Sequence, residues 1–210
     1  MGCCISLSPH YYYQLCKLFR IFLYGICNTS TPNLKTIVGC MFAGKTWLLI
    51  SIIKHFKNSK KLRCLMIRNS RDKAVDKHNK LFENIYHEMV DSNKLLEVVT
   101  DGYDAIFIDE GQFFPDIVEF ANEQLKLSKY VFVACISTDF NGNQFENIGE
   151  LLAISDDICK CYSICAKCGA YASLTIRTKV ECTKKIVVGG EDMYEPNCRP
   201  CFLIYHSKTK

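Results

Sequence analysis

One short stretch limits the folds open to this chain more than any other: Gly39, four intervening residues, then Gly44, Lys45 and Thr46. Glycines in these places let backbone N–H groups curl around phosphate oxygens, while the lysine neutralises charge and the threonine hydroxyl can bind magnesium. A short β-like run precedes Gly39, and apolar residues at helical spacing follow Lys45. The stretch therefore predicts a triphosphate-binding loop between a strand and a helix.

Strand-like and helix-like segments alternate along the middle of the chain. Strands are predicted at residues 34–38, 62–67, 103–108 and 130–136, and helices at 45–56, at 76–90 and just after Pro115. This alternation predicts an α/β fold of the P-loop, RecA-like kind, with a mostly parallel sheet covered by helices on both faces.

After about residue 158 the sequence changes to cysteine pairs and short β-like runs. We therefore expect three parts. Residues 1–33 would be an N-terminal extension that is disordered or loosely packed, residues 34–157 a nucleotide-binding domain, and residues 158–210 a small zinc-binding domain.

The composition is that of a globular protein, with 49% hydrophobic and 23% charged residues. Lys17 and Arg20 interrupt the apolar stretch over 11–27, which argues against a secretory signal and a membrane span. We therefore expect the 14 cysteines to be free thiols or metal ligands in a reducing, cytoplasmic compartment.

The first third of the chain is basic, since no Asp or Glu precedes Asp72. This basic first third either suits triphosphates or an anionic membrane surface, or is merely uneven surface charge.

A second motif follows the predicted strand at 103–108. Asp109 at the strand end suits the acidic residue that holds magnesium beside a phosphate loop. Glu110 follows at once, and a carboxylate beside the terminal phosphate can take a proton from an attacking hydroxyl or water. The alternative is that Glu110 is a solvated charge at the end of a strand.

Two C-x2-C pairs point to a metal site near the C-terminus. Cys165, Cys168, Cys198 and Cys201 can supply four thiolates to one Zn²⁺, in a closed structural site that staples the intervening loop. The alternative is that these four residues are ordinary buried cysteines that bind no metal. Cys159, Cys161 and Cys182 lie nearby with poorer spacing, so we expect them to be packing or surface thiols. Between the pairs, a β-like run leads to Gly189 and Gly190, which predicts either a flap over a substrate or a plain hairpin turn.

Taken in order, the phosphate loop, the segment "IDEGQFFPDIVEF" and the two cysteine pairs flanking a Gly-Gly flap resemble the type II thymidine kinases of cells and large DNA viruses. The resemblance covers about residues 34–203. It implies that ATP and thymidine are the substrates and that Mg²⁺ with ATP and a structural Zn²⁺ are the cofactors. It further implies a homotetramer that thymidine triphosphate inhibits, with a lasso loop over the substrate.

The resemblance also assigns roles to single residues. Glu110 would be the catalytic base for the thymidine 5′-hydroxyl. The implied ATP- and phosphate-binding residues are Gly39, Met41, Phe42, Ala43, Gly44, Lys45, Thr46, Asp109 and Gln112. The implied substrate-binding residues are Met41, Phe113, Phe140, Thr175, Val187 and Tyr194, and the metal ligands are the four paired cysteines. From the sequence alone, Phe113 and Phe140 would more often be core residues.

Three departures from the family pattern bear on activity. Cys40 stands where the family usually has proline, and Asp72-Lys73-Ala74 stands where it has an Asp-x-Arg motif. Ser137-Thr138 replaces the Asp-Gly of its "LDGTF" stretch, although Phe140 aligns. These changes affect the expected rate and nucleoside specificity more than ATP binding.

The N-terminus begins "MGCCIS", which fits an N-myristoylation signal at Gly2 with palmitoylation sites at Cys3 and Cys4. Membrane association is expected only if this end is acylated.

Two other functions compete with the kinase. One is a nucleic-acid-driven ATPase with a zinc ribbon. We expect no nucleic-acid partner, because the chain is short for a helicase and its basic face lacks interleaved aromatics. The other is a non-catalytic relative that binds nucleotide without turnover.

Overall fold

The computed structural model describes residues 31–69, 89–178 and 192–208. The predicted acylation sites at Gly2, Cys3 and Cys4, the Asp72-Lys73-Ala74 segment, and Val187 with the Gly-Gly flap all lie outside these ranges. Within the described residues, no helix is long and apolar enough to cross a membrane.

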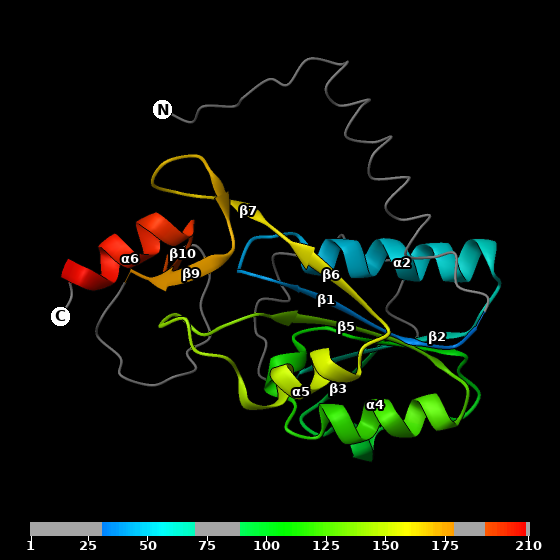
Figure 1. The fold of residues 1–210 in the computed structure, drawn as a ribbon. Helices are drawn as coiled ribbons and strands as arrows, with labels where there is room; N and C mark the ends of the chain where they lie inside the picture. The colour runs from blue at the N-terminus through cyan, green and yellow to red at the C-terminus, as the bar shows by residue number, and fades with distance from the viewer. Residues whose placement is uncertain (1–30, 70–88, 179–191, 209–210) are drawn as a thin grey trace, which may run out of the picture. The chain divides into compact units, whose positions relative to one another are not determined.

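Six parallel strands form the central sheet in the order β3-β2-β4-β5-β1-β6 (Figure 1). Their bounds are β1 Leu34–Gly39, β2 Cys64–Asn69, β3 Met89–Ser92, β4 Ala105–Ile108, β5 Tyr130–Ile136 and β6 Asp157–Cys161. The predicted parallel sheet is confirmed. Because the carboxyl ends of parallel strands meet at one edge, the loops after β1, β4 and β5 converge there.

One sequence-based expectation, the end of the helix predicted over residues 76–90, needs correction. Residues 76–88 of the helix predicted over 76–90 lie outside the described residues. Residues 89 and 90 are not helical, because they belong to β3 and pair with β2. The sheet also extends beyond residue 157, the predicted end of the nucleotide-binding domain, since β6 pairs in parallel with β1 as far as Cys161.

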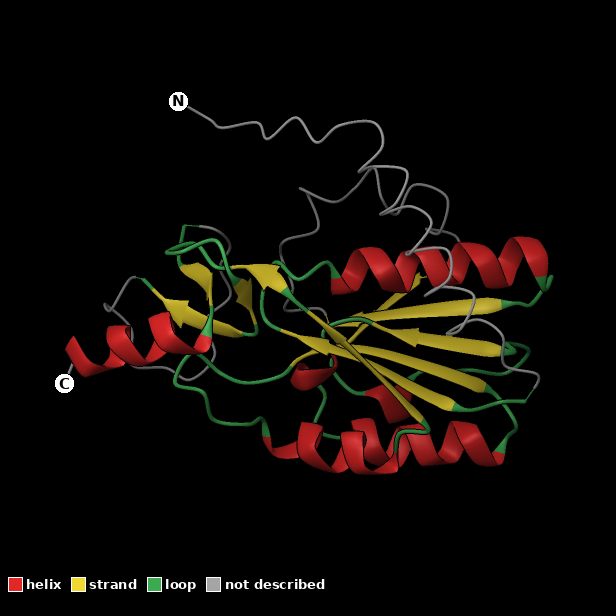
Figure 2. Cartoon of the chain, turned by 45° about the horizontal axis from the view of Figure 1, so that its top comes forward, coloured by secondary structure: helices red, strands yellow, loops and turns green. Residues whose placement is uncertain are grey.

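Helices cover both faces of the sheet, as predicted. Helix α2 (Lys45–Ser59) lies on one face, and α4 (Ile117–Lys126) and α5 (Glu146–Ile154) lie on the other (Figures 1 and 2). On the α2 face the ring of Phe56 meets Phe107 and Phe132 edge-on, with centroids 5.9 and 5.1 Å away. This aromatic cluster fixes the helix that begins at the phosphate loop.

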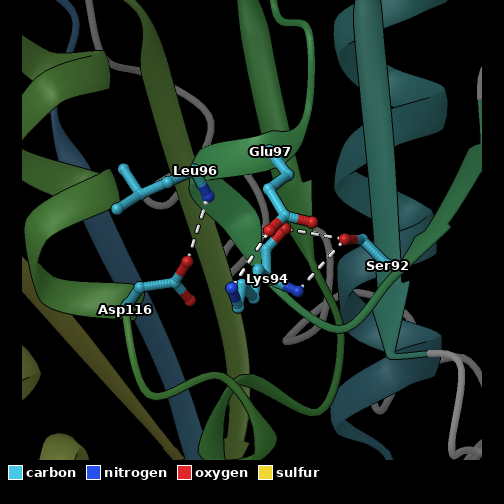
Figure 3. A network of polar contacts seen from close by, with 5 residues as sticks. All are labelled: Ser92, Lys94, Leu96, Glu97 and Asp116. Atoms are coloured by element: carbon cyan, nitrogen blue, oxygen red, sulfur yellow. Dashed lines mark hydrogen bonds and ion pairs between the residues drawn. The ribbon is translucent and has the colours of Figure 1, made fainter.

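A polar network fastens the connection between β3 and β4 (Figure 3). The chain forms a short 3-10 turn, η2 (Leu95–Glu97), whose Leu96 N–H donates to a carboxylate oxygen of Asp116 over 3.0 Å. Ser92 Oγ accepts from the Lys94 N–H over 3.1 Å, and Lys94 forms an ion pair with Glu97. The turn is thereby held against the start of α4.

The C-terminal part consists of two small antiparallel sheets and one helix. Strands β7 (Ser163–Ile164) and β8 (Tyr171–Ala172) form one hairpin. Strands β9 (Leu174–Arg177) and β10 (Tyr194–Asn197) pair with each other, and α6 (Arg199–Lys208) follows. Phe202 of α6 packs with Leu174 and Ile176 of β9 in a small apolar cluster.

Candidate active site

The phosphate loop leaves β1 at Gly39 and ends where α2 begins. A Cβ atom added to Gly39 would lie 2.5 Å from the carbonyl oxygen of Cys161, so only glycine fits there. Phe42 and Gly44 have positive φ angles of 62° and 76°, and these angles turn the loop back on itself. The Gly44 carbonyl accepts from the Leu48 N–H over 3.0 Å, so the loop runs straight into the first turn of the helix.

Lys45 and Thr46 connect the loop to the strand that carries the acidic motif. Lys45 is only 7% exposed, and its Nζ donates to the Cys40 carbonyl over 2.8 Å, which holds the ammonium group inside the loop. Thr46 Oγ1 donates to Asp109 Oδ1 over 3.1 Å, and the same oxygen accepts from the Glu110 N–H over 3.1 Å. A hydroxyl beside a buried carboxylate is the oxygen donor set that Mg²⁺ takes next to a triphosphate.

Glu110 has an unusual backbone and a well-defined partner. Its φ of 55° lies in the left-handed region, which few non-glycine residues adopt. Gln112, in the 3-10 turn η3 (Gly111–Phe113), donates through Nε2 to Glu110 Oε2. Gln112 Oε1 accepts from the Ile136 N–H over 3.0 Å. Gln112 thus ties the carboxylate to the end of β5, in an orientation set by two strands.

Two neighbouring phenylalanines of this segment have different environments. Phe114 is fully buried in the core between the sheet and α4, whereas Phe113 is half-buried. Phe140, which follows β5, is also half-buried. Phe113 and Phe140 are therefore less completely buried than the core residue Phe114.

Arg177 holds together two of the residues expected to line the substrate. Its guanidinium carbon lies 3.9 Å from the ring centroid of Phe140 and 5.5 Å from that of Tyr194. Arg177 also donates to Tyr194 Oη over 3.1 Å, and its carbonyl accepts from Tyr205 Oη over 2.7 Å. This cation–π stack joins the loop after β5 to the β9–β10 pair.

The C-terminal part contacts the phosphate loop directly at two points. The Met41 N–H donates to Thr175 Oγ1 over 3.0 Å, and the Cys40 thiol donates to the Ala172 carbonyl over 3.3 Å. Burial raises the pKa of Cys40, which keeps the thiol protonated as a donor. Cys40, where the family usually has proline, therefore makes a contact that proline would lack.

The four paired cysteines come together as predicted. The Sγ atoms of Cys165, Cys168, Cys198 and Cys201 all lie within 4.8 Å of one another. Four Zn–S bonds of about 2.3 Å in a tetrahedron need sulfur separations of about 3.8 Å, and soft thiolates select zinc among the common ions. The donor set and its spacing therefore fit a structural zinc ion. Cys40 and Ala172 pack against Cys165 and Cys198, so the four-cysteine cluster and the phosphate loop share one apolar contact.

A sequence profile of the thymidine kinase family matches residues 32–202. The chain belongs to the thymidine kinase family. The thymidine kinase of Acanthamoeba polyphaga mimivirus is 34% identical over 192 residues, which cover 84% of each chain. The variola virus thymidine kinase is 35% identical over 174 residues, which cover 81% of this chain and 97% of the viral one. The vaccinia virus enzyme (strain Western Reserve) is 34% identical over a stretch of the same length and coverage.

Family membership makes this chain a kinase, in agreement with the prediction from its motifs. Among solved structures, domain III of the Thermotoga maritima replication initiation protein DnaA is similar to this chain over 75% of this chain's length and 64% of the DnaA domain's length. Its TM-score is 0.42 and its identity 17%.

Sequence reasoning missed two residues that organise the site of this thymidine kinase family member. Arg177 is 4% exposed, and its only sequence signal is a lone cation at the end of an apolar strand. Asp139 accepts from the N–H groups of Asn141 and Asn143, both over 2.9 Å, and thereby shapes the loop that carries Phe140. The sequence feature that could have pointed to Asp139 is the turn-forming stretch "DFNGN" at residues 139–143.

Proposed function

We propose that this chain transfers the γ-phosphate of ATP to the 5′-hydroxyl of thymidine, giving ADP and thymidine monophosphate. Family membership supports the substrate pair. The observation that carries the chemistry is the carboxylate of Glu110, oriented by Gln112 beside the Thr46–Asp109 pair. In this position Glu110 accepts the proton of the attacking hydroxyl as the new P–O bond forms and the ADP oxygen leaves.

The phosphate loop positions the triphosphate. Backbone N–H groups of the loop between Gly39 and Gly44, other than that of Met41, surround the phosphate oxygens together with the buried Lys45 and offset their charge. Thr46 and Asp109 would hold a magnesium ion, which would supply positive charge beside the phosphates. The Lys45 ammonium exchanges its bond to the Cys40 carbonyl for phosphate oxygens when the nucleotide binds.

The thymine pocket is proposed to be lined by Met41, Phe113, Phe140, Thr175, Val187 and Tyr194. Thr175 accepts from the Met41 N–H, and its own hydroxyl hydrogen is left to donate to a carbonyl oxygen of the base. Phe140 and Tyr194 offer ring surface that Arg177 holds in place. Because Thr175 bonds to the phosphate loop itself, the pocket for the acceptor and the cradle for the donor form one structure.

The four-cysteine cluster is proposed to hold a structural Zn²⁺. With this ion bound, β7, β8 and the start of α6 become one rigid module against the phosphate loop. We further propose that the enzyme works in the cytoplasm as a homotetramer, following the family resemblance. The predicted divisions at 1–33, 34–157 and 158–210 stay a proposal as well, with the qualification that β6 belongs to the central sheet.

The experiment follows radiolabelled phosphate from γ-labelled ATP into thymidine, deoxycytidine and deoxyuridine. Zinc-loaded protein is expected to label thymidine. The Glu110→Gln variant should label thymidine at least about 100-fold more slowly, since general base catalysis contributes about 10²–10⁴-fold to the rate. Glu119→Gln, an exposed glutamate on α4, is the matched control and should keep the full rate. A well-folded, zinc-loaded protein that forms no labelled thymidine monophosphate would overturn the proposal.

A further inference from the structure

Trp47 is the only tryptophan of the chain, and it lies where the phosphate loop becomes helix α2. It directly follows Lys45 and Thr46, which hold the phosphates in the proposed function, yet that function gives Trp47 no role. The residue is 48% exposed, although tryptophan is on average a well-buried residue type. Because indole offers the largest flat face of any side chain, its place beside a nucleotide cradle bears on what the cradle binds.

The helical repeat turns Trp47 away from the sheet. Side chains of α2 that face the sheet, such as Leu49, Ile52 and Phe56, are buried, and each successive residue is rotated by about 100° around the helix axis. Trp47 consequently lies on the opposite, outer face. Side chains of a helix also lean toward its N-terminus, so a residue in the first turn leans over the loop that precedes the helix.

The acidic motif decides which end of a bound triphosphate lies where. Thr46 bonds to Asp109 at the end of β4, and Glu110 follows, so the terminal phosphate belongs on the side of the loop next to the sheet. The other phosphates then run back along the loop, and the nucleoside leaves the cradle on the side away from Glu110. Trp47 faces away from the sheet, and therefore toward the nucleoside end of the donor.

The outer side of the phosphate loop has room for a base. A Cβ atom added to Gly44, at the start of α2, would meet no atom within 4 Å. Gly44 and Phe42 are themselves exposed. The other end of the loop is closed, since a Cβ atom on Gly39 would meet the Cys161 carbonyl oxygen at 2.5 Å. Open space in the loop thus lies over the turn toward which Trp47 leans.

We propose that Trp47 is a specificity-determining residue that stacks on the base of the donor nucleotide and favours a purine. The inference rests on the proposed function, because it takes a nucleoside triphosphate as the ligand of the phosphate loop. A purine presents two fused rings to the indole and a pyrimidine only one, so the stacked area is larger for ATP than for UTP. The phosphate contacts of the loop cannot make this distinction, since the two nucleotides have the same triphosphate.

The test uses the fluorescence of this one tryptophan together with calorimetry. The full, zinc-loaded chain is titrated with ATP, UTP and inorganic tripolyphosphate, each with magnesium. We expect ATP to change the tryptophan emission strongly, because a stacked base replaces water on the indole face. Tripolyphosphate, which has no base, should change the emission much less. Calorimetry should show that ATP binds several-fold more tightly than UTP.

Variants separate stacking from phosphate binding. Removing a stacked aromatic ring weakens the binding of a base by about 5- to 150-fold. Trp47→Leu should therefore bind ATP about tenfold more weakly by calorimetry, lose most of the preference for ATP over UTP, and keep its affinity for tripolyphosphate. Trp47→Phe should recover most of the ATP affinity. Tyr171→Leu, at an exposed aromatic residue on β8, is the matched control and should bind ATP like the unaltered chain. Circular dichroism and zinc content check that each variant is folded.

Two results would overturn the stacking role of Trp47. One is a folded Trp47→Leu variant that binds ATP as tightly as the unaltered chain. The other is an equal loss of affinity for ATP and tripolyphosphate, which would mean that Trp47 acts on the loop and not on the base. The thymidine-labelling assay reports separately on the kinase. If ATP binding depends on Trp47 but no thymidine monophosphate forms, only the proposed function fails. If the product forms but ATP binding ignores Trp47, only the stacking role fails.

Discussion

The residue that follows the left-handed Glu110 has no room for a side chain. A Cβ atom on Gly111 would lie 2.5 Å from Val133 Cγ1, which is fully buried in β5. We therefore predict that Gly111→Ala destabilises the fold by about 1–3 kcal/mol, because Val133 cannot yield without disturbing the core. Urea unfolding of both proteins measures the difference in the free energy of unfolding.

Gly149→Ala in α5 is the matched control for this substitution. Its nearest atom would be the side-chain oxygen of the exposed Gln144, at 3.0 Å, which can move aside. Alanine is the better helix former by up to about 1 kcal/mol, so this variant should be neutral or more stable. Equal destabilisation by both substitutions would contradict the packing argument for Gly111.

At the scale of elements, the β9–β10 pair and the loop after β5 meet at Arg177. We predict that Arg177→Lys raises the KM for thymidine about tenfold while changing the KM for ATP much less. Lysine keeps the charge but loses both the planar stack on Phe140 and the directed hydrogen bond to Tyr194. Steady-state kinetics with each substrate varied in turn provides the measurement.

Arg199→Lys tests whether the effect belongs to the site. Arg199 is exposed at the start of α6, so its replacement should leave both KM values unchanged. If Arg177→Lys raised the two KM values equally, Arg177 would act on the phosphate loop rather than on the thymidine pocket.

The buried Lys129, between α4 and β5, is hydrogen-bonded to Thr100, which lies between η2 and β4. Lys129 Nζ donates to the Thr100 carbonyl over 2.6 Å and to the Thr100 hydroxyl over 3.0 Å, and that hydroxyl donates to Gln124 Oε1 over 2.8 Å. Thr100→Val removes the hydroxyl and leaves the buried Gln124 oxygen without this donor. The expected loss is about 1–3 kcal/mol of unfolding free energy, by urea titration. Val99→Thr, at an exposed neighbour, should change the free energy of unfolding little, and a similar loss there would point to the conformation of this loop rather than to the hydrogen-bond network.

At the scale of the whole described unit, hydrogen bonds and apolar contacts connect the four-cysteine cluster to the phosphate loop. Cys40 bonds to Ala172 and Met41 to Thr175, so loosening the cysteine cluster should loosen the nucleotide cradle. We predict that Cys168→Ser, or zinc removal by a chelator, lowers Tm and weakens ATP binding together. A structural zinc ion contributes on the order of 10 kcal/mol to the folding of small zinc domains.

Zinc content, thermal melting and nucleotide titration of the same preparations measure this coupling. Tyr171→Ser is the control, because Tyr171 lies near the cluster in sequence but is 80% exposed. It should retain zinc, Tm and ATP affinity. Zinc-free protein that melts at the same temperature and binds ATP as tightly would show that the two sites are independent.

The segments whose chemistry is local could be predicted from the amino-acid sequence alone. The phosphate loop, the Asp109-Glu110 pair and the C-x2-C pairs could be recognised because turns and helices set their spacing over a few residues. The alternation of apolar runs likewise predicted the parallel sheet, which the structure confirms. The family resemblance built on these motifs is confirmed by the profile match.

The folded structure shows which distant segments meet. It placed β6 in the central sheet, Thr175 on the Met41 N–H, and Arg177 between Phe140 and Tyr194. It also placed the sulfurs of Cys159 and Cys161, expected to be packing or surface thiols, 3.9 Å apart on β6, next to the start of the phosphate loop. These contacts depend on how strands and loops pack in three dimensions, and neither hydrophobic periodicity nor motif spacing carries that information.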